Sequence, residues 1–310
     1  MEGVLVLASY LILLVMVLVS VAFITLAEQK LLAGMQVRVG PNFTGLFGLL
    51  QPFADAVKLL SKESVSSRFS GLKIYYFSPM VGLSVSMVMW VGYVFDKGGV
   101  DLSYSVLLFM CLSGLMVYPI LTSGWSSNCK YSMLGSLRAV AQMVSYEVSM
   151  AMVLLSLVWL SGSFSFYGLA ESQYLLWNFF FFPPLGYIWY VSSLAETNRA
   201  PYDFAEGESE LVSGFNTEYG SSGFTLIFMM EYSGLLFMGF LFSVLFLSSV
   251  VGVGLVFKSV LVVFSFIWVR GSLPRYRYDK LMGLAWKSFL PITLLMFSYY
   301  LSMSESSLFC

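Results

Sequence analysis

Long uncharged apolar runs alternate with short polar segments along most of the chain. A helix needs about 20 apolar residues to cross the roughly 30 Å of hydrocarbon in a bilayer, and eight runs reach that length. The stretch 219–269 would be about 75 Å long as one helix, so we expect it to fold back near Ser248–Gly254. The pattern therefore predicts eight transmembrane helices at approximately 3–27, 74–95, 102–122, 139–162, 172–195, 223–248, 250–269 and 283–303.

The composition agrees with an all-α polytopic membrane protein that forms a single integral membrane domain over residues 1–310. Hydrophobic residues make up 58% of the sequence and charged residues only 11%. A typical soluble domain is about 25% charged. The net charge of −1 gives no indication of a nucleic-acid partner.

Two gaps in the composition restrict the chemistry that the chain can carry. It has no histidine, which excludes His-ligated haem or copper and histidine acid–base catalysis. The cysteines Cys111, Cys129 and Cys310 are far apart and form no C-x-x-C pair, so neither an iron–sulfur cluster nor a zinc site is expected. No G-x-G-x-x-G motif follows a strand. We therefore expect this chain to bind no metal, flavin or iron–sulfur cluster.

The basic residues are concentrated on one side of the predicted topology. Fourteen of the 16 Lys and Arg residues fall in the segments 28–73, 123–138, 196–222 and 270–287. Lys97 lies on the other face, and Lys258 lies within the seventh run. Positively charged loops stay on the negative side of a membrane. These four inner loops are thus expected in a bacterial cytoplasm or a mitochondrial matrix, with both termini on the opposite side.

The four inner loops differ in the sign of their charge. The loop 196–222 has six acidic residues against Arg199, whereas the other three have net charges of +3, +2 and +4. Neighbouring carboxylates repel one another unless cations compensate them, so we expect the basic loops to fold around the acidic loop. A solvated acidic loop is the alternative.

The first inner loop contains a predicted amphipathic helix. Its apolar side chains recur at helical spacing and its polar side chains take the opposite face. The apolar set is Leu46, Leu49, Leu50, Phe53, Val57 and Leu60, and the polar set is Gln51, Asp55, Lys58 and Lys62. A helix of this kind lies along the membrane surface with its apolar side down.

Two carboxylates fall inside predicted spans, Glu147 in the fourth and Glu231 in the sixth. An ionisable group at such a depth costs about 3 kcal/mol or more and marks a functional site by default. A structural ion pair is the alternative. Helical geometry places Glu147 opposite a polar stripe of the same span. The stripe consists of Arg138, Gln142, Ser145, Ser149 and Ser156. A helix that is polar on both faces is expected inside the bundle.

Four long blocks, together about a third of the chain, carry most of its polar patterning. They are LAEQKLLAGMQVRVGPN through LLQPFADAVKLLSKE (26–63), GWSSNCKYSMLGSLRAVAQMVSYEV (124–148), LAETNRAPYDFAEGESELVSGFNTEYG (194–220) and RGSLPRYRYDKLMGLAWKSFLP (270–291). All four closely resemble the family of subunit 1 of mitochondrial NADH–ubiquinone oxidoreductase, respiratory complex I. The chain departs from the family pattern at Gln29, where the family usually has Arg.

The resemblance implies a core subunit of proton-translocating NADH:ubiquinone oxidoreductase in the mitochondrial inner membrane. The charged loops would face the matrix and both termini the intermembrane space. In that family the subunit forms the membrane-level part of the ubiquinone tunnel and begins a carboxylate path for protons. The implied tunnel residues of this chain are Gln36, Arg38, Asp55, Arg199, Asp203, Glu206, Arg275 and Arg277. The implied proton-path residues are Glu147, Glu196, Glu206 and Glu231.

The resemblance also implies partners. Ubiquinone would be the substrate, and lipid would surround the spans. Electrons would come from the matrix-arm quinone-site and iron–sulfur subunits, and antiporter-like membrane subunits would continue the proton path. The chain alone would then hold no complete active site.

Two other functions fit a polytopic membrane protein. A stand-alone cation/proton transporter could use Glu147 and Glu231 as its ion site, although the chain shows no internal duplication of the kind common in transporters. A purely structural membrane anchor is also possible, but it does not explain the carboxylates inside the spans.

Overall fold

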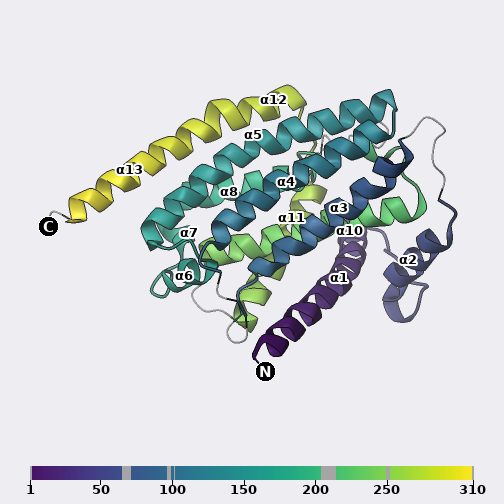
Figure 1. Cartoon of the computed structure of the whole chain (residues 1–310), viewed down its shortest axis with the longest axis horizontal. Coiled ribbons are helices and arrows are strands. Elements are labelled where there is room, and N and C mark those ends of the chain that lie inside the picture. The colour runs from purple at the N-terminus through teal and green to yellow at the C-terminus, as the bar shows by residue number, and fades with distance from the viewer. Residues whose placement is uncertain are drawn as a thin grey trace.

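The computed structural model describes residues 2–64, 71–95, 99–100, 102–203, 214–248 and 252–308. Within these ranges all regular secondary structure is helical, so the predicted all-α class is confirmed. Several long helices run alongside one another, and α13 extends beyond the others toward the C-terminus (Figure 1).

Seven helical segments of the described ranges are long and apolar enough to cross a membrane. Their main helices are α1 (Glu2–Met35), α3 (Leu72–Met89), α4 (Ser105–Ser126), α5 (Lys130–Ser161), α10 (Ser221–Phe242), α11 (Val253–Ser272) and α13 (Leu290–Leu308). A π-helix over Ser243–Leu247 continues α10, and another over Leu284–Phe289 joins α12 (Tyr278–Gly283) to α13. These segments correspond to seven of the eight predicted spans.

The predicted fifth span over 172–195 is not one helix. The chain forms α6 (Phe166–Glu171), the short α7 (Asn178–Phe181) and then α8 (Pro183–Glu196). Pro183 and Pro184 lack backbone N–H groups, and a residue that precedes proline avoids the helical region, so a new helix begins at Pro183. The 14 residues of α8 reach only about 21 Å, less than the thickness of the hydrocarbon layer.

Several of the predicted inner loops are partly helical, and the loop 270–287 contains α12. The first helix, α1, continues to Met35, and α5 already begins at Lys130, so both helices extend beyond their apolar runs. The first inner loop also contains α2 (Gln51–Ser61), where the amphipathic helix was predicted. The Phe53 ring of α2 meets the edge of Phe23 on α1, with ring centroids 6.0 Å apart. The position of α2 at a membrane surface stays a prediction.

The interior of the bundle is formed mainly by α5 and α10. Gln142, Ser149 and Ser156 of the polar stripe on α5 are fully buried, which confirms the prediction of an internal helix. The Ser149 and Ser156 hydroxyls donate to carbonyls of α5 itself, so the helix satisfies them without partners from outside. Gln142 bonds to other segments and is considered below. By contrast, the side chains of Leu5, Leu11 and most of their apolar neighbours on α1 are exposed, as expected of a helix that faces lipid.

A pair of tyrosines joins α3 to the start of α10. Pro79 interrupts α3 and has no N–H for the carbonyl of Tyr75, four residues earlier. The Tyr219 hydroxyl donates to that carbonyl over 3.2 Å, and its ring stacks on the Tyr75 ring at 4.3 Å between centroids. The Tyr75 hydroxyl in turn donates to the carbonyl of Glu218 over 2.6 Å. The part of α3 that precedes Pro79 therefore binds Glu218 and Tyr219 at the C-terminal end of the acidic loop.

We expect Tyr219→Phe to lower the free energy of unfolding by about 1–2 kcal/mol, because the ring stack remains while the Tyr75 carbonyl loses the nearer of its two hydroxyl donors, the other being Ser78. The measurement is the thermal unfolding midpoint of the purified protein in detergent. Tyr76→Phe is the matched control, because Tyr76 is exposed on the same helix. Equal midpoints for the two variants would contradict a role of the Tyr219 hydroxyl in stability.

Candidate functional site

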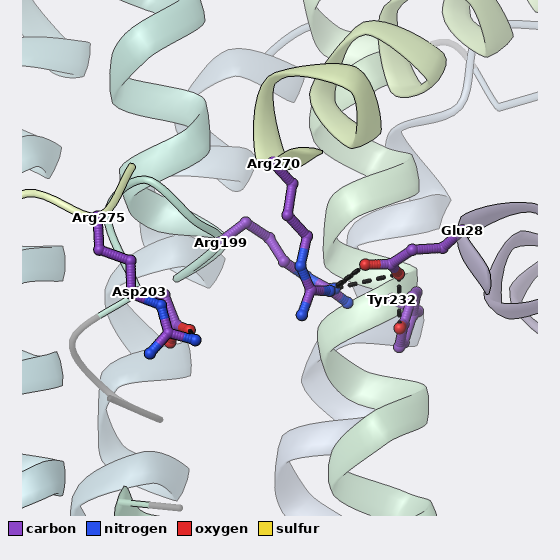
Figure 2. A network of polar contacts seen from close by, with 6 residues as sticks. All are labelled: Glu28, Arg199, Asp203, Tyr232, Arg270 and Arg275. Carbon is purple, nitrogen blue, oxygen red and sulfur yellow. Dashed lines mark hydrogen bonds and ion pairs between the residues drawn. The ribbon is translucent and has the colours of Figure 1, made fainter. Parts of the chain in front are cut away.

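A buried carboxylate at the inner end of α1 holds three other segments together (Figure 2). Glu28 is only 4% exposed. Nη1 of Arg199 lies 3.0 and 3.2 Å from the two Glu28 oxygens, and Arg270 also donates to Glu28. The Tyr232 hydroxyl of α10 donates to Oε2 over 2.7 Å. These four residues form the Glu28 cluster.

The end of α8 explains how Arg199 reaches this position. Asn198 has a left-handed backbone, with φ of 49°, and the N–H of Arg199 donates to the carbonyl of Leu194. This is the pattern of a Schellman cap, in which Asn replaces the more usual Gly and a proline soon follows. The cap and Pro201 turn the chain sharply, so that Arg199 points toward α1. Arg270 lies in the last turn of α11, where a cation is favoured by the helix dipole.

The ionised groups of the Glu28 cluster have a net charge of +1, which the nearby carboxylate of Glu231 offsets. One carboxylate faces two guanidinium groups, and Arg199 also interacts electrostatically with the carboxylate of Glu231. The guanidinium carbon of Arg199 lies 4.2 Å from the centroid of the Tyr232 ring, a cation–π contact. A buried charge without a partner is costly, so each member depends on the others.

A second ion pair lies beside the first. Asp203, which is buried, forms an ion pair with Arg275, with 3.4 Å between Oδ2 and Nη2, and the backbone N–H of Tyr276 donates to the carbonyl of Pro201. The Tyr202 and Tyr276 rings stack at 5.5 Å between centroids. The predicted contact between the basic loop 270–287 and the acidic loop is therefore present. The contact of the first basic loop differs from the prediction. There the acidic loop supplies the cation, Arg199, and the basic loop supplies the carboxylate, Glu28.

Glu147 of α5 points toward α4. The Ser113 hydroxyl donates to Oε1 of Glu147 over 3.2 Å. Next to Ser113, a Cβ atom at Gly114 would stand 3.2 Å from the same oxygen, closer than most Cβ contacts. The glycine thus leaves the space that the carboxylate occupies.

A cavity of about 60 Å³ lies between Ser113 and two further carboxylates, Glu196 and Glu231. It has room for about two water molecules. Asn198 also lines the cavity, and Oε2 of Glu196 is buried with no hydrogen-bond partner among the described residues. The wall between the polar groups includes Met89, Met116, Met143, Met230 and Met238.

The environment of Glu196 favours its neutral form. Its Oε2 is buried among the side chains that line the cavity and accepts no hydrogen bond from a described residue. Burial of a carboxylate without a donor disfavours its charged form.

The structure brings some of the sequence-predicted residues together and separates others. Arg199, Asp203 and Arg275 belong to the two ion pairs. Glu196 and Glu231 line the cavity, and Glu147 is bonded to Ser113, which also lines it. Four predicted residues have other surroundings, and one cannot be placed: Gln36 and Arg38 are exposed, Asp55 accepts from Gln51 of its own helix, Arg277 pairs with exposed Asp279, and Glu206 lies outside the described residues.

Sequence reasoning missed Glu28, Arg270 and Tyr232. A signal for Glu28 was present, because this carboxylate directly follows an uncharged apolar run and enters the same helix. Arg199 is the only cation of a loop with six acidic residues, so nothing in the sequence indicated that its partner lies on α1. Tyr232 had no such signal. Among the described residues, no group of His, Cys, Asp and Glu is arranged to hold a metal ion.

Glu28→Gln should lower the free energy of unfolding by about 3 kcal/mol, because it leaves the largely buried guanidinium of Arg199 and the partly exposed one of Arg270 without their shared carboxylate. The expected result is a clear drop in the thermal unfolding midpoint in detergent. Asp279→Asn removes an exposed partner of Arg277 and should change stability by less than about 1 kcal/mol. If Glu28→Gln behaved like this control, the cluster would not stabilise the fold.

Comparison with known proteins identifies the family. Residues 8–301 match the family described as NADH dehydrogenase. The chain is 52% identical over 295 residues to NADH-ubiquinone oxidoreductase chain 1 of Aedes aegypti, which covers 95% of this chain and 94% of the relative. The proteins of the same name from Locusta migratoria (49% over 297 residues; 96% and 95% covered) and Balaenoptera physalus (45% over 295 residues; 93% of each) are also similar. The chain therefore belongs to the NADH dehydrogenase family.

Proposed function

We propose that the chain is the core membrane subunit of NADH:ubiquinone oxidoreductase that forms the membrane-level part of the ubiquinone tunnel and starts the proton path. The relatives are named as chain 1 of NADH-ubiquinone oxidoreductase, a numbered chain of a larger assembly. In this function ubiquinone is the substrate. Electrons come from matrix-arm subunits, since the chain has no cysteine pattern for a cluster. Antiporter-like subunits receive the proton path.

The carboxylate-lined cavity carries the proposal for the proton path. Glu196 and Glu231 line it at one side, and at the other Ser113 bonds to Glu147. Two waters in the cavity would complete a hydrogen-bonded chain between these groups. The buried Oε2 of Glu196, which accepts no hydrogen bond from a described residue, supports a carboxyl that binds a proton and passes it on. The methionine wall limits access of further water because thioether side chains are apolar and fill space.

The two ion pairs support the proposal for the quinone tunnel. Arg199, Arg270 and Arg275 place hydrogen-bond donors at the inner end of the bundle, beside apolar helix faces. A quinone combines an apolar tail with carbonyl oxygens that accept hydrogen bonds, so both surfaces match its chemistry. Gln36 and Arg38, exposed just after α1, would extend this surface toward the matrix-arm subunits.

The proposed topology has eight crossings. Seven segments are long enough alone, and α6, α7 and α8 together make the eighth. The four inner loops then face the mitochondrial matrix and both termini the intermembrane space, in the inner membrane. The helix α2 lies along the matrix surface of the membrane.

We expect Glu147→Gln to leave the assembled enzyme intact but to lower quinone reduction about tenfold or more, because the amide keeps size and hydrogen bonding but cannot carry a proton. The measurements are rotenone-sensitive NADH oxidation and proton pumping in membrane vesicles. Glu171→Gln, an exposed carboxylate outside the cavity, is the matched control. Normal turnover with normal pumping in Glu147→Gln would remove Glu147 from the path.

The topology predicts which side of the membrane can reach Cys129. This cysteine precedes α5 in the second inner loop and should face the matrix. In sealed mitoplasts a membrane-impermeant maleimide should leave Cys129 unlabelled, and it should label Cys129 once the membrane is opened, as measured by peptide mass spectrometry. A Cys129→Ser variant gives the background. Labelling of Cys129 in sealed mitoplasts would overturn the orientation and, with it, the placement of the tunnel.

A further inference from the structure

One side chain of α5 binds both ends of a short segment that carries residues of both proposed sites. The amide nitrogen of Gln142 donates to the carbonyl of Ala195 and to the carbonyl of Tyr202, each over 2.8 Å. A primary amide has two N–H donors, so both are used. The side chain is fully buried.

The segment between these two carbonyls carries Glu196 of the cavity and Arg199 of the Glu28 cluster. Asp203, which pairs with Arg275, follows directly after Tyr202. Gln142 forms no hydrogen bond with any of the three. It binds the backbone on both sides of Glu196 and Arg199 and thereby fixes the segment 195–202 at the start of the acidic loop.

The position of Gln142 on α5 adds a second connection. Glu147 lies five residues later on the same helix, and its side chain points to Ser113 on α4. The helix α5 therefore carries Glu147, which bonds to Ser113 at the cavity, and holds Glu196 of the cavity through the Gln142 amide. The Schellman cap of α8 and the bond from Tyr276 to Pro201 also hold the segment, but each binds only one part of it.

We propose that Gln142 is a positioning residue that sets the placement of Glu196 and Arg199 relative to α5. The inference rests on the proposed function, since it is that function which gives the two side chains their roles. Only a side chain with two donors at this length can bind both carbonyls. Ionised Glu offers no donor, Met offers none, and Asn is one methylene shorter and cannot span both.

The test uses Gln142→Met in the complete respiratory enzyme, because Met has similar volume but no donor. Hydrogen–deuterium exchange of the peptide that contains 195–203 should become faster, since two backbone carbonyls lose their partner. The KM for a short-chain ubiquinone should rise about three- to tenfold, the loss expected from one or two weakened hydrogen bonds. The pH profile of quinone reduction should also shift, because the surroundings of Glu196 change.

Three comparisons make the result specific. NADH oxidation by a hydrophilic electron acceptor should stay normal, because that reaction does not reach the quinone. Ser156→Ala is the matched control, because Ser156 is equally buried on α5 but bonds only to Val153 of its own helix. Gln142→Asn keeps one donor within reach and should show intermediate exchange and KM. It also decides the matter if the Met variant does not assemble.

Unchanged exchange of the 195–203 peptide in Gln142→Met, or in Gln142→Asn where only that variant assembles, would overturn the positioning role. Faster exchange with a normal KM and a normal pH profile would support the positioning role but contradict the proposed part of Glu196 and Arg199 in quinone reduction. A failure of the inference and a failure of the proposed function therefore give different results.

Discussion

A buried carboxylate must be paired, and the arrangement of the inner end of the bundle follows from how Glu28 is paired. Its donors come from the turn after α8, from the end of α11 and from the middle of α10, so four separate segments converge on one group. An ion pair of this kind adds little net stability compared with apolar packing, but the loss of one partner is costly. Its effect is to specify geometry. Arg199 can satisfy Glu28 only if α8 ends where it does and the chain turns at Asn198 and Pro201.

The same helices serve the cluster and the cavity. Glu231 and Tyr232 are neighbours on α10, about 100° apart around the helix, so one side chain lines the cavity while the next reaches Glu28. On α5, the amide of Gln142 holds the segment 195–202, which carries Arg199, and Glu147 points to α4. A rotation or shift of α5 or α10 would therefore change the geometry of the Glu28 cluster and of the cavity together. Packed helices respond as units because their interiors are dense and do not deform continuously.

The sequence predicted features that depend on composition and periodicity and failed where three-dimensional partners decide. Apolar runs located seven spans, and the polar stripe on α5 correctly indicated an internal helix. Charge arithmetic correctly brought Arg275 to the acidic loop. The net charge of each loop could not show that Arg199 pairs with Glu28, because a net charge does not tell which charged residue of the loop is buried. The fifth predicted span is divided into short helices, and α8 begins at Pro183 because a proline lacks the backbone N–H that a continuous helix needs. The cavity depends on five methionines that look like ordinary membrane residues in sequence.

Arg199 links the two places electrostatically as well as mechanically. Its guanidinium forms an ion pair with Glu28 and also interacts electrostatically with the carboxylate of Glu231. Protonation of Glu231 removes one of the two negative charges that attract Arg199. The ion pair with Glu28 is then the main electrostatic attraction on that cation. Conversely, a ligand that draws Arg199 or Arg270 away from Glu28 leaves a buried negative charge, which favours the uptake of a proton nearby. Such reciprocity is required of any two sites that share a charged group. Under the proposed function, a movement of this one side chain is enough to begin the coupling between quinone reduction and proton movement.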